Sequence, residues 1–380
     1  MKLAFICFYE AYPPISGAAS VSYNIAKYST GEKILIQMSQ EDGQQQISDN
    51  LTLISIKGPS ESGWKKIIRI NKVISKIVKN IAEIVPDVVV LEGASWVMYH
   101  WMLFRQIKKR MPKIKIVYHS HNVEYLLRKG KHGCLVCILT KWAESNIIHH
   151  ADMAFAVSAV DSTQFESLYS IQPKILPNGV DIEKFDKVTE DEIRATKQKY
   201  GLDDNTVLFM GLYLYKPNRD GVDFLVKTVM PKVLERCQNA KLAVIGGDIP
   251  YHEEWLITPG IIDHYELPAF VKSCGIGVAP IFSGSGTRLK ILEYMAAGKP
   301  VVSTGKGAEG LNISDGHDIL IADDADGFSS EIIRLLRDRE ATFQIGENGR
   351  KFVTSRYSWE IIAENFHHCI ERLSNRRSIT

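Results

Sequence analysis

The chain has 380 residues, of which 45% are hydrophobic and 24% are charged. These proportions are typical of a globular protein and exclude a disordered or fibrous chain. The sequence has no apolar run of the roughly 20 residues that span a bilayer, and Leu3 to Phe8 is too short for a secretory signal, so we expect a cytoplasmic protein.

The net charge of +2 conceals an asymmetry along the chain. Residues 1–175 contain 21 Lys and Arg against 14 Asp and Glu, whereas the remainder contains 25 against 30. A basic first half favours contact with an anionic surface or substrate.

Short apolar runs alternate with stretches of helical period, a pattern typical of βαβ units and parallel sheets. It predicts an α/β fold with two Rossmann-like domains, residues 1–176 and 182–357, joined through the turn Pro177-Asn178-Gly179. Residues 358–380 are expected to form a final helix. The expected strands are Leu3–Phe8, Val88–Leu91, Ile114–Tyr118, Met153–Val157 and Ile175–Leu176, then Val207–Met210, Leu242–Ile245, Ile276–Ala279, Val301–Ser303 and Ile319–Ile321.

The segment 64–81 has a basic and an apolar face at helical spacing. Basic residues stand at positions 65, 69, 72, 76 and 79, and apolar residues at 67, 70, 74, 77 and 81. One interpretation is peripheral binding to an anionic membrane surface, and the other is a core-packed helix with a solvated charged face. The absence of acids from Trp64 to Lys79 favours the membrane. Nucleic acid is not expected as a partner, because the basic runs lack interleaved aromatics.

Cys134 and Cys137 form a C-x-x-C pair beside His132. Because a second pair at zinc spacing does not follow, we expect these cysteines to pack on one side of a helix rather than to bind a metal.

A glycine-rich loop, Gly284-Ser285-Gly286-Thr287, follows a predicted strand and precedes a predicted helix. Glycines let the backbone approach an anion closely, and a helix start offers unpaired N–H groups. Arg288 and Lys290 in the first turn oppose the helix dipole, which a bound diphosphate would explain; surface exposure, or a pair with Glu293, is the alternative.

Glu293 lies on or beside the stripe of this helix that faces the core. A carboxylate there needs partners. Ribose hydroxyls and an internal ion pair are the two interpretations, and we favour ribose.

The run from Gly284 to Thr304 closely resembles the donor-site signature of the GT-B glycosyltransferases known as family 4. Pro177-Asn178-Gly179-Val180-Asp181 resembles the interdomain junction of the same family. The resemblance implies two Rossmann-like domains facing across a cleft, with a final helix that crosses back to the first domain. It also implies that the second domain binds the nucleotide-sugar and the first binds the acceptor.

The resemblance extends to single positions. Glu293 matches the ribose-binding glutamate of the family, and Gly17 lies in a segment similar to its N-terminal glycine loop. His121 and Asn122 match the step near the reaction centre and are expected to touch the transferred sugar. The resemblance further implies a reaction without a metal or other cofactor, usually with retained anomeric configuration.

The sequence departs from the family at Ser285, where an acid is usual. Glu309, in a loop similar to the one near the donor sugar, is a candidate to replace that acid. The diphosphate-binding Gly-Arg and Lys-Gly stretch of many members is also missing after Gly211. Lys216 and Arg219 in that region are alternative phosphate ligands, but Arg288 and Lys290 are better placed, so we assign the phosphates to them.

These observations predict transfer of a sugar from a nucleoside diphosphate to a glycan or lipid-linked acceptor, in cell-surface polysaccharide or glycolipid synthesis. The enzyme would be cytoplasmic, or peripheral on the inner face of the membrane. Two alternatives remain: an epimerase or hydrolase of nucleotide-sugars on the same frame, and a catalytically inactive binding subunit.

Overall fold

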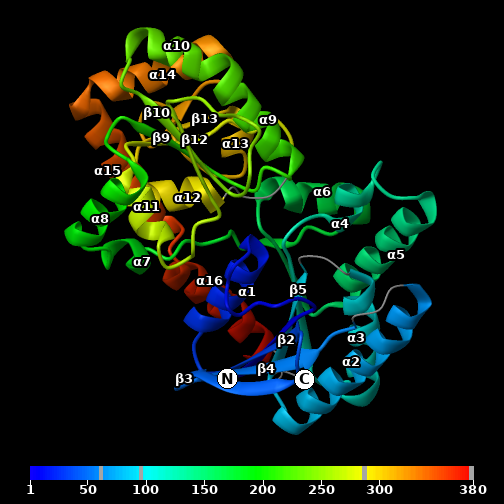
Figure 1. Ribbon diagram of the computed structural model, residues 1–380. Coiled ribbons are helices and arrows are strands. Elements are labelled where there is room, and N and C mark those ends of the chain that lie inside the picture. Colours follow the sequence, from blue (N-terminus) through cyan, green and yellow to red (C-terminus); the bar gives the residue numbers. More distant parts are fainter. Residues whose placement is uncertain (60–62, 94–96, 285–288, 376–380) are drawn as a thin grey trace. The chain divides into compact units, whose positions relative to one another are not determined.

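The structure is a computed structural model that describes residues 1–59, 63–93, 97–284 and 289–375 (Figure 1). The chain forms two compact units. The first comprises Met1–Asn178 together with Trp359–Thr380, and the second comprises Gly179–Ser358. Among the described residues, none of the helices is long and apolar enough to cross a membrane.

The first unit contains an eight-stranded sheet in the order β3-β4-β2-β1-β5-β6-β7-β8. Its strands run parallel except β3, which is antiparallel to β4. The strands are β1 Lys2–Cys7, β2 Glu32–Ser39, β3 Gly43–Ser48, β4 Leu51–Lys57, β5 Val88–Gly93, β6 Lys115–Ser120, β7 Met153–Ala156 and β8 Lys174–Ile175. The helices are α1 Gly17–Tyr28, α2 Gly63–Ile84, α3 Val97–Arg110, α4 Glu124–Arg128, α5 Cys134–His150, α6 Ala159–Tyr169 and α16 Trp359–Asn375.

The last helix, α16, packs on the first unit through its aromatic residue Phe366. The Phe366 ring lies 6.0 Å from that of Phe5 in β1 and 5.6 Å from that of Phe155 in β7. Burial of these three rings explains why the C-terminal segment belongs to this unit. The opposite face of the sheet carries a core formed with α2, α3 and α5.

The helix α2 contains the whole segment 64–81, in which the sequence showed a basic and an apolar face. From residue 69 onward, Ile70, Ile74, Ile77 and Ile81 are buried in the core, while the lysines between them are exposed. Its apolar residues are therefore already packed against the protein. This is the arrangement of a core-packed helix with a solvated charged face, and only that basic face is available to a partner.

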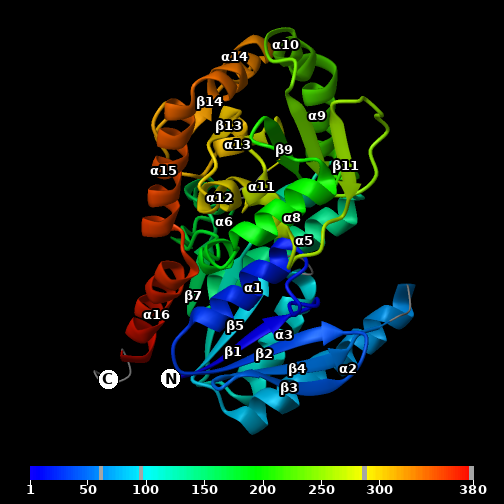
Figure 2. The same cartoon turned by 60° about the vertical axis from the view of Figure 1, so that its left-hand side comes forward.

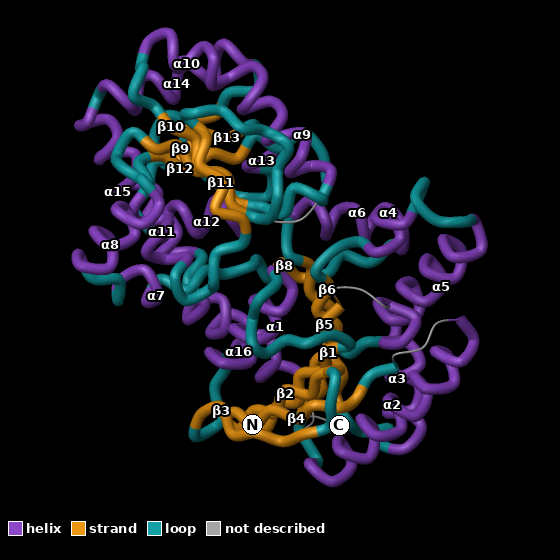
Figure 3. The backbone as a smooth tube through the Cα atoms, viewed as in Figure 1, coloured by secondary structure: helices purple, strands orange, loops and turns teal. Residues whose placement is uncertain are grey.

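The second unit contains a six-stranded parallel sheet in the order β11-β10-β9-β12-β13-β14 (Figure 3). Its strands are β9 Thr206–Met210, β10 Lys241–Ile245, β11 Leu256–Gly260, β12 Ile276–Ala279, β13 Val301–Ser303 and β14 Leu320–Ile321. The helices are α7 Glu183–Asp186, α8 Glu190–Tyr200, α9 Lys216–Phe224, the π-helical turn η1 Leu225–Val229, α10 Met230–Arg236, α11 Leu267–Ser273, α12 Leu289–Ala296, α13 Gly305–Ala308, α14 Ala325–Arg337 and α15 Arg339–Arg356.

Both faces of the second sheet are covered by helices, and residues of one strand alternate between two cores. Leu208 and Met210 of β9 pack with α11, α12 and α15, whereas Val207 and Phe209 pack with η1, α10 and α14 (Figure 2). Because a parallel sheet is buried on both faces, its strands read as continuous apolar runs, which is why they could be predicted.

The predicted positions are confirmed for ten strands, whose ends differ from the predicted ends by at most two residues. These strands are β1, β5, β6, β7, β8, β9, β10, β12, β13 and β14. The predicted terminal helix is also confirmed, as α16. Four strands were not predicted: β2, β3, β4 and β11.

A buried acid, Glu144 of α5, gives the first unit a pH-dependent stability. Its carboxylate accepts hydrogen bonds from the backbone N–H groups of Glu124 (2.7 Å) and Tyr125 (3.1 Å) and from the Tyr169 hydroxyl (2.7 Å). Burial nevertheless raises the pKa of Glu144 to about 7. The fold therefore favours the protonated carboxyl.

We expect the unfolding free energy to fall by about 3 kcal/mol as the pH rises from about 4.5 to above 7. The sign follows from the raised pKa: this contribution is fully present below the pKa of the unfolded chain and is lost as the pH passes that of the folded state. Glu144→Gln should flatten this slope in urea unfolding measured at several pH values. Glu166→Gln, at an exposed position of α6, is the matched control, and an unchanged slope in Glu144→Gln would contradict the assignment.

Candidate functional site

The second unit places the predicted donor residues at the carboxyl edge of its parallel sheet. The strand β12 ends at Ala279 and α12 begins at Leu289, so the glycine loop connects them. Gly284 is exposed, and its φ of +98° lies in the region that favours glycine. Ser285, Gly286, Thr287 and Arg288 lie outside the described residues. Ligands of open α/β sheets bind at this edge.

Thr304, directly after β13, fixes the start of this connection. Its Oγ1 donates to the carbonyl of Ile281 (2.5 Å) and accepts from the backbone N–H groups of Ile281 (3.2 Å) and Gly307 (3.0 Å). A Cβ at Gly307 would lie 2.5 Å from the carbonyl oxygen of Ala279, so only glycine permits this approach. The turn after β13 is thereby tied to the residues from which the glycine loop departs.

Glu293 of α12 forms an ion pair with Lys184 of α7. The Nζ of Lys184 lies 2.5 Å from Oε1 of Glu293, and the two side chains are 31% and 24% exposed. The internal ion pair that the sequence left as an alternative is therefore present. Oε1 carries this contact, so the pairing also leaves Oε2 as an acceptor at a partly exposed position.

Lys290, one turn earlier on α12, is held by two neutral groups. Its Nζ donates to Oδ1 of Asn218 (3.0 Å) and lies 4.0 Å from the centre of the Phe209 ring. A carboxamide oxygen and an aromatic ring, both neutral, therefore help to orient the ammonium. These contacts of Lys290 and Glu293 differ from the pair that their spacing suggested.

Two further predicted site residues lie at the surface: Glu309 is partly exposed to solvent, and Gly17 is exposed. Glu309 pairs with Lys306 of α13, and both side chains keep about a third of their surface exposed. Gly17 begins α1 and is exposed, and the preceding Ser16 caps the helix by accepting from the Ala19 N–H (3.2 Å). The sequence predicted neither the Lys306 pair nor the cap.

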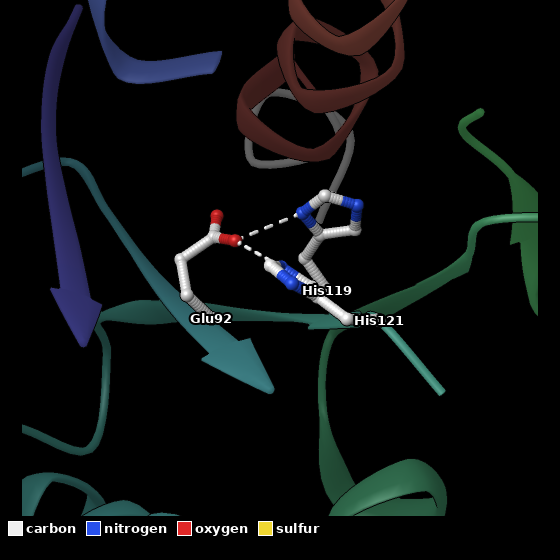
Figure 4. A group of neighbouring side chains, drawn as sticks. All are labelled: Glu92, His119 and His121. Carbon is white, nitrogen blue, oxygen red and sulfur yellow. Dashed lines mark hydrogen bonds and ion pairs between the residues drawn. The ribbon is translucent and has the colours of Figure 1, made fainter. Parts of the chain in front are cut away.

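In the first unit, His121 belongs to a buried network around Glu92 (Figure 4). The Oε2 of Glu92 lies 2.7 Å from Nε2 of His121 and 3.1 Å from Nδ1 of His119. It also accepts from the Ser22 hydroxyl of α1 (3.0 Å), which lies 2.7 Å from the Tyr9 hydroxyl. Glu92 is fully buried, while His121 keeps 7% of its surface exposed.

The register of the sheet explains why these residues meet. Glu92 of β5 is the direct partner of His119 in the neighbouring β6, and His121 follows two residues later, on the same face. The N–H of His121 donates to the Gly93 carbonyl (3.1 Å), which keeps this segment beside β5 after the strand ends. Asn122 is half-buried, and its carbonyl accepts from the Ser120 hydroxyl (2.6 Å).

The contacts in this network shift the pKa values of its members in different directions. Burial opposes ionisation of Glu92, but the charge of His119 and hydrogen bonds from both imidazoles outweigh it, so the pKa of Glu92 is lowered. Burial lowers the pKa of His121, against the opposing effect of its hydrogen bond to Glu92. Burial and the Glu92 charge raise the pKa values of Cys7 and Tyr9.

His121 is therefore neutral at pH 7, and its Nε2 carries the proton that is donated to Glu92. This tautomer leaves Nδ1 as a hydrogen-bond acceptor. Glu92 thus sets which nitrogen of His121 can accept a hydrogen bond.

The same three residues, Glu92, His119 and His121, are the cluster whose geometry could hold a metal among the residues that the structure describes. Their nearest ligand atoms lie within 4.8 Å of one another. However, both imidazoles approach the same carboxylate oxygen at hydrogen-bonding distances. The geometry therefore favours a hydrogen-bonded network.

Sequence analysis missed the residues that hold the predicted ones: Glu92, Ser22, Lys184 and Asn218. One signal was present, because Glu92 is an acid at the end of the apolar run Val88–Leu91. Acids are seldom fully buried without partners, so such a position points to a site. The other three carry no comparable signal, because their roles depend on tertiary contacts.

Comparison with known proteins supports a common family. Residues 204–338 match the family model described as glycosyl transferases group 1. A GDP-mannose-dependent monoacylated alpha-(1-6)-phosphatidylinositol monomannoside mannosyltransferase of Corynebacterium glutamicum is 25% identical over 278 residues, covering 67% of this chain and 68% of that protein.

Solved structures share the fold at low sequence identity. Sucrose-phosphate synthase from Thermosynechococcus elongatus superposes with a TM-score of 0.78 at 15% identity, covering 99% of this chain and 100% of that one. The Anabaena protein HepE in complex with UDP-glucose gives a TM-score of 0.71 at 15% identity, with 98% and 100% covered. Together with the two Rossmann-like sheets, these similarities show that the chain has the GT-B fold, and within it residues 204–338 match the group 1 glycosyltransferase family.

Proposed function

We propose that this glycosyltransferase moves a hexose from a nucleoside diphosphate sugar to a lipid-linked acceptor at an anionic membrane surface. The observation that carries the proposal is the arrangement on α12, where Asn218 holds Lys290 and Lys184 holds Glu293 beside the glycine loop. The name of the Corynebacterium relative supports GDP-mannose as the first donor to test and an acylated phosphatidylinositol glycoside as the acceptor class. UDP-glucose, the ligand of the Anabaena protein, is the second donor to test.

In this proposal the second unit binds the donor nucleotide. Glu293 accepts hydrogen bonds from the ribose hydroxyls, and Lys290 and Arg288 bind the diphosphate with the backbone of Gly284 to Thr287. Glu309 or Ser285 contacts the sugar. Lys184 and Asn218 hold the side chains of Glu293 and Lys290 in place before the donor binds. Donor binding therefore loses less side-chain conformational entropy.

In the first unit, His121 is proposed to accept a hydrogen bond from a hydroxyl of the transferred sugar, with Asn122 and the Gly17 loop beside it. Positive groups stabilise the diphosphate as its bond to the anomeric carbon breaks. The acceptor hydroxyl attacks that carbon from the same face and gives its proton to the leaving phosphate, so the configuration is retained. No metal takes part in this scheme. The fixed tautomer of His121 supports this role, because a neutral imidazole with a free acceptor nitrogen can order a hydroxyl without adding charge.

A binding and product assay tests the function. Thermal-shift measurements with GDP, UDP and ADP and with their sugars should show stabilisation by one nucleotide family. Products formed from the best donor, with and without a phosphatidylinositol glycoside, then separate transfer from epimerisation or hydrolysis. A purified protein that binds no nucleotide would instead support the inactive binding subunit.

Lys290 should act on the diphosphate and not on the nucleoside. We expect Lys290→Ala to weaken nucleoside diphosphate binding about tenfold and to leave nucleoside binding nearly unchanged, because an ammonium contact to phosphate is lost. Arg288→Ala should show the same selectivity. Lys232→Ala is the matched control, since Lys232 lies on α10, before the start of β10, and is paired with Asp326 at 2.6 Å. Calorimetric titration measures all three, and equal losses for both ligands would refute the phosphate role.

A further inference from the structure

The first half of α5 exposes apolar side chains to solvent. Leu135 is 69% exposed, Ile138 58% and Trp142 48%, and Val136 and Leu139 are also exposed. The second half of the same helix is different, because Ala143 and Ile147 are fully buried. Figure 1 shows α5 beside α3 in the first unit.

These five residues, Leu135, Val136, Ile138, Leu139 and Trp142, are named here the α5 apolar surface. Positions 135, 138, 139 and 142 follow the spacing that gathers side chains on one face of a helix. Thr140, on the other side, is buried. The helix therefore turns its apolar face outward, the reverse of a helix that packs on a core. Exposed clusters of apolar side chains mark surfaces that bind a membrane or another molecule.

The exposed charges near this surface are positive. Lys129 and Lys131 precede the helix and are exposed, and Lys141 lies within it, 5.2 Å from the centre of the Tyr125 ring. The acids of the same region, Glu124 and Glu144, are both buried. The C-x-x-C residues also lie on this helix: Cys134 is exposed and Cys137 is partly exposed.

We propose that the α5 apolar surface inserts into the interface of a bilayer containing anionic lipid. Leucine and isoleucine side chains would enter the acyl boundary, Trp142 would lie at the headgroup level, and the lysines would contact lipid phosphates. The inference rests on the proposed function, whose lipid-linked acceptor would be delivered by the same bilayer. The α5 apolar surface takes the membrane-binding role that the sequence suggested for the segment 64–81, because the apolar face of α2 is packed in the core.

The charge pattern argues against a second copy of the chain as the occupant. In a two-fold symmetric dimer the same surface meets itself, so the lysines of one copy would border those of the other. Like charges at such a rim oppose association, whereas an anionic bilayer attracts them.

Vesicle co-sedimentation of the full chain tests the proposal. We expect binding to vesicles of phosphatidylcholine with about one-third phosphatidylglycerol, and weaker binding to phosphatidylcholine alone. The double variant Ile138→Ser/Leu139→Ser should bind at least about tenfold more weakly, because two apolar side chains no longer leave water. Phe343→Ser, at a residue 65% exposed on α15, is the matched control and should bind as the parent does.

Two further readouts separate the possible outcomes. Trp142→Phe should lose the tryptophan fluorescence blue shift that vesicles induce in the parent. A thermal shift with nucleotide shows that each variant is folded. If the double variant binds nucleotide and still binds vesicles as tightly as the parent, the α5 apolar surface is not the membrane contact, and the proposed function is unaffected. Sedimentation velocity that shows a dimer abolished by the double variant would overturn the bilayer as the occupant. Failure of the parent to bind any nucleotide, with vesicle binding retained, would refute the function and not the surface.

Discussion

Glu92→Gln is expected to lower kcat about 100-fold while the KM for the donor changes less than about threefold. Glu92 touches no substrate in the proposed scheme and acts through His121. Its charge orients the imidazole and keeps the proton on Nε2, whereas a carboxamide can donate as well as accept and no longer selects one tautomer. The steady-state rates of sugar transfer measure this effect.

The pH profile distinguishes a positioning role from a structural one. Burial lowers the pKa of His121, and the hydrogen bond to Glu92 partly offsets this. Removing the negative charge should lower the pKa of His121 further, so the acid limb of the kcat profile should move to lower pH. Charged and titratable groups facing Glu92 come from β6 (His119 and His121) and from β1 and the residues after it (Cys7 and Tyr9).

Ser22→Ala is the matched control for Glu92→Gln. It removes one hydrogen bond to the same carboxylate oxygen and keeps the charge, so the rate should fall by less than about threefold. A rate loss in Glu92→Gln without any shift of the acid limb would indicate that Glu92 only supports the fold. A metal ion that copurifies with the parent and is absent from Glu92→Gln would identify the cluster as a metal site instead.

Glu293→Ala is expected to weaken binding of the donor nucleotide about 30-fold or more. A carboxylate that accepts hydrogen bonds from ribose hydroxyls contributes about 2 kcal/mol, since bonds to a charged group are stronger than neutral ones. The loss should be similar for nucleoside and nucleoside diphosphate, because the ribose is common to both. Calorimetric titration with the nucleotide identified in the thermal-shift screen provides the measurement.

Lys184→Met separates this role from that of the ion pair. It removes the partner of Glu293 but leaves the carboxylate, so nucleotide affinity should change less than about threefold. The stability cost should also be small, because both side chains are partly exposed and solvent screens their attraction. If the two variants lose affinity equally, the ion pair, and not ribose recognition, is the function of Glu293.

The strands that were missed show the limit of sequence patterns. The β3 sequence Gly43–Ser48 is mostly polar and pairs antiparallel at the edge of its sheet, where exposed side chains give no apolar signal. The β11 sequence contains Pro259 and lies at the other sheet's edge, where a proline is tolerated. Most of the other parallel strands, in contrast, are apolar and were predicted. The strands β2 and β4 are exceptions, because they are internal, pair parallel and contain apolar runs, yet were not predicted.

The segment 64–81 illustrates a second limit. Its two faces were correctly read as basic and apolar, but periodicity cannot say whether an apolar face meets a core or a membrane. The buried positions of Ile70, Ile74 and Ile77 decide this for α2. The run Leu135 to Leu139 has equally apolar residues, and only its exposure in the fold reveals a surface that needs a partner.

Sequence alone determined that the chain has two Rossmann-like sheets and identified most of their parallel strands, because burial on both faces makes a strand apolar along its length. It also located the glycine loop and the acid on the following helix, for which we propose a diphosphate and a ribose as ligands. The tertiary structure decided the partners: Lys184 for Glu293, Asn218 for Lys290, and Glu92 for His121. These contacts join residues that are 109, 72 and 29 positions apart, and only the register of strands and the docking of helices bring them together.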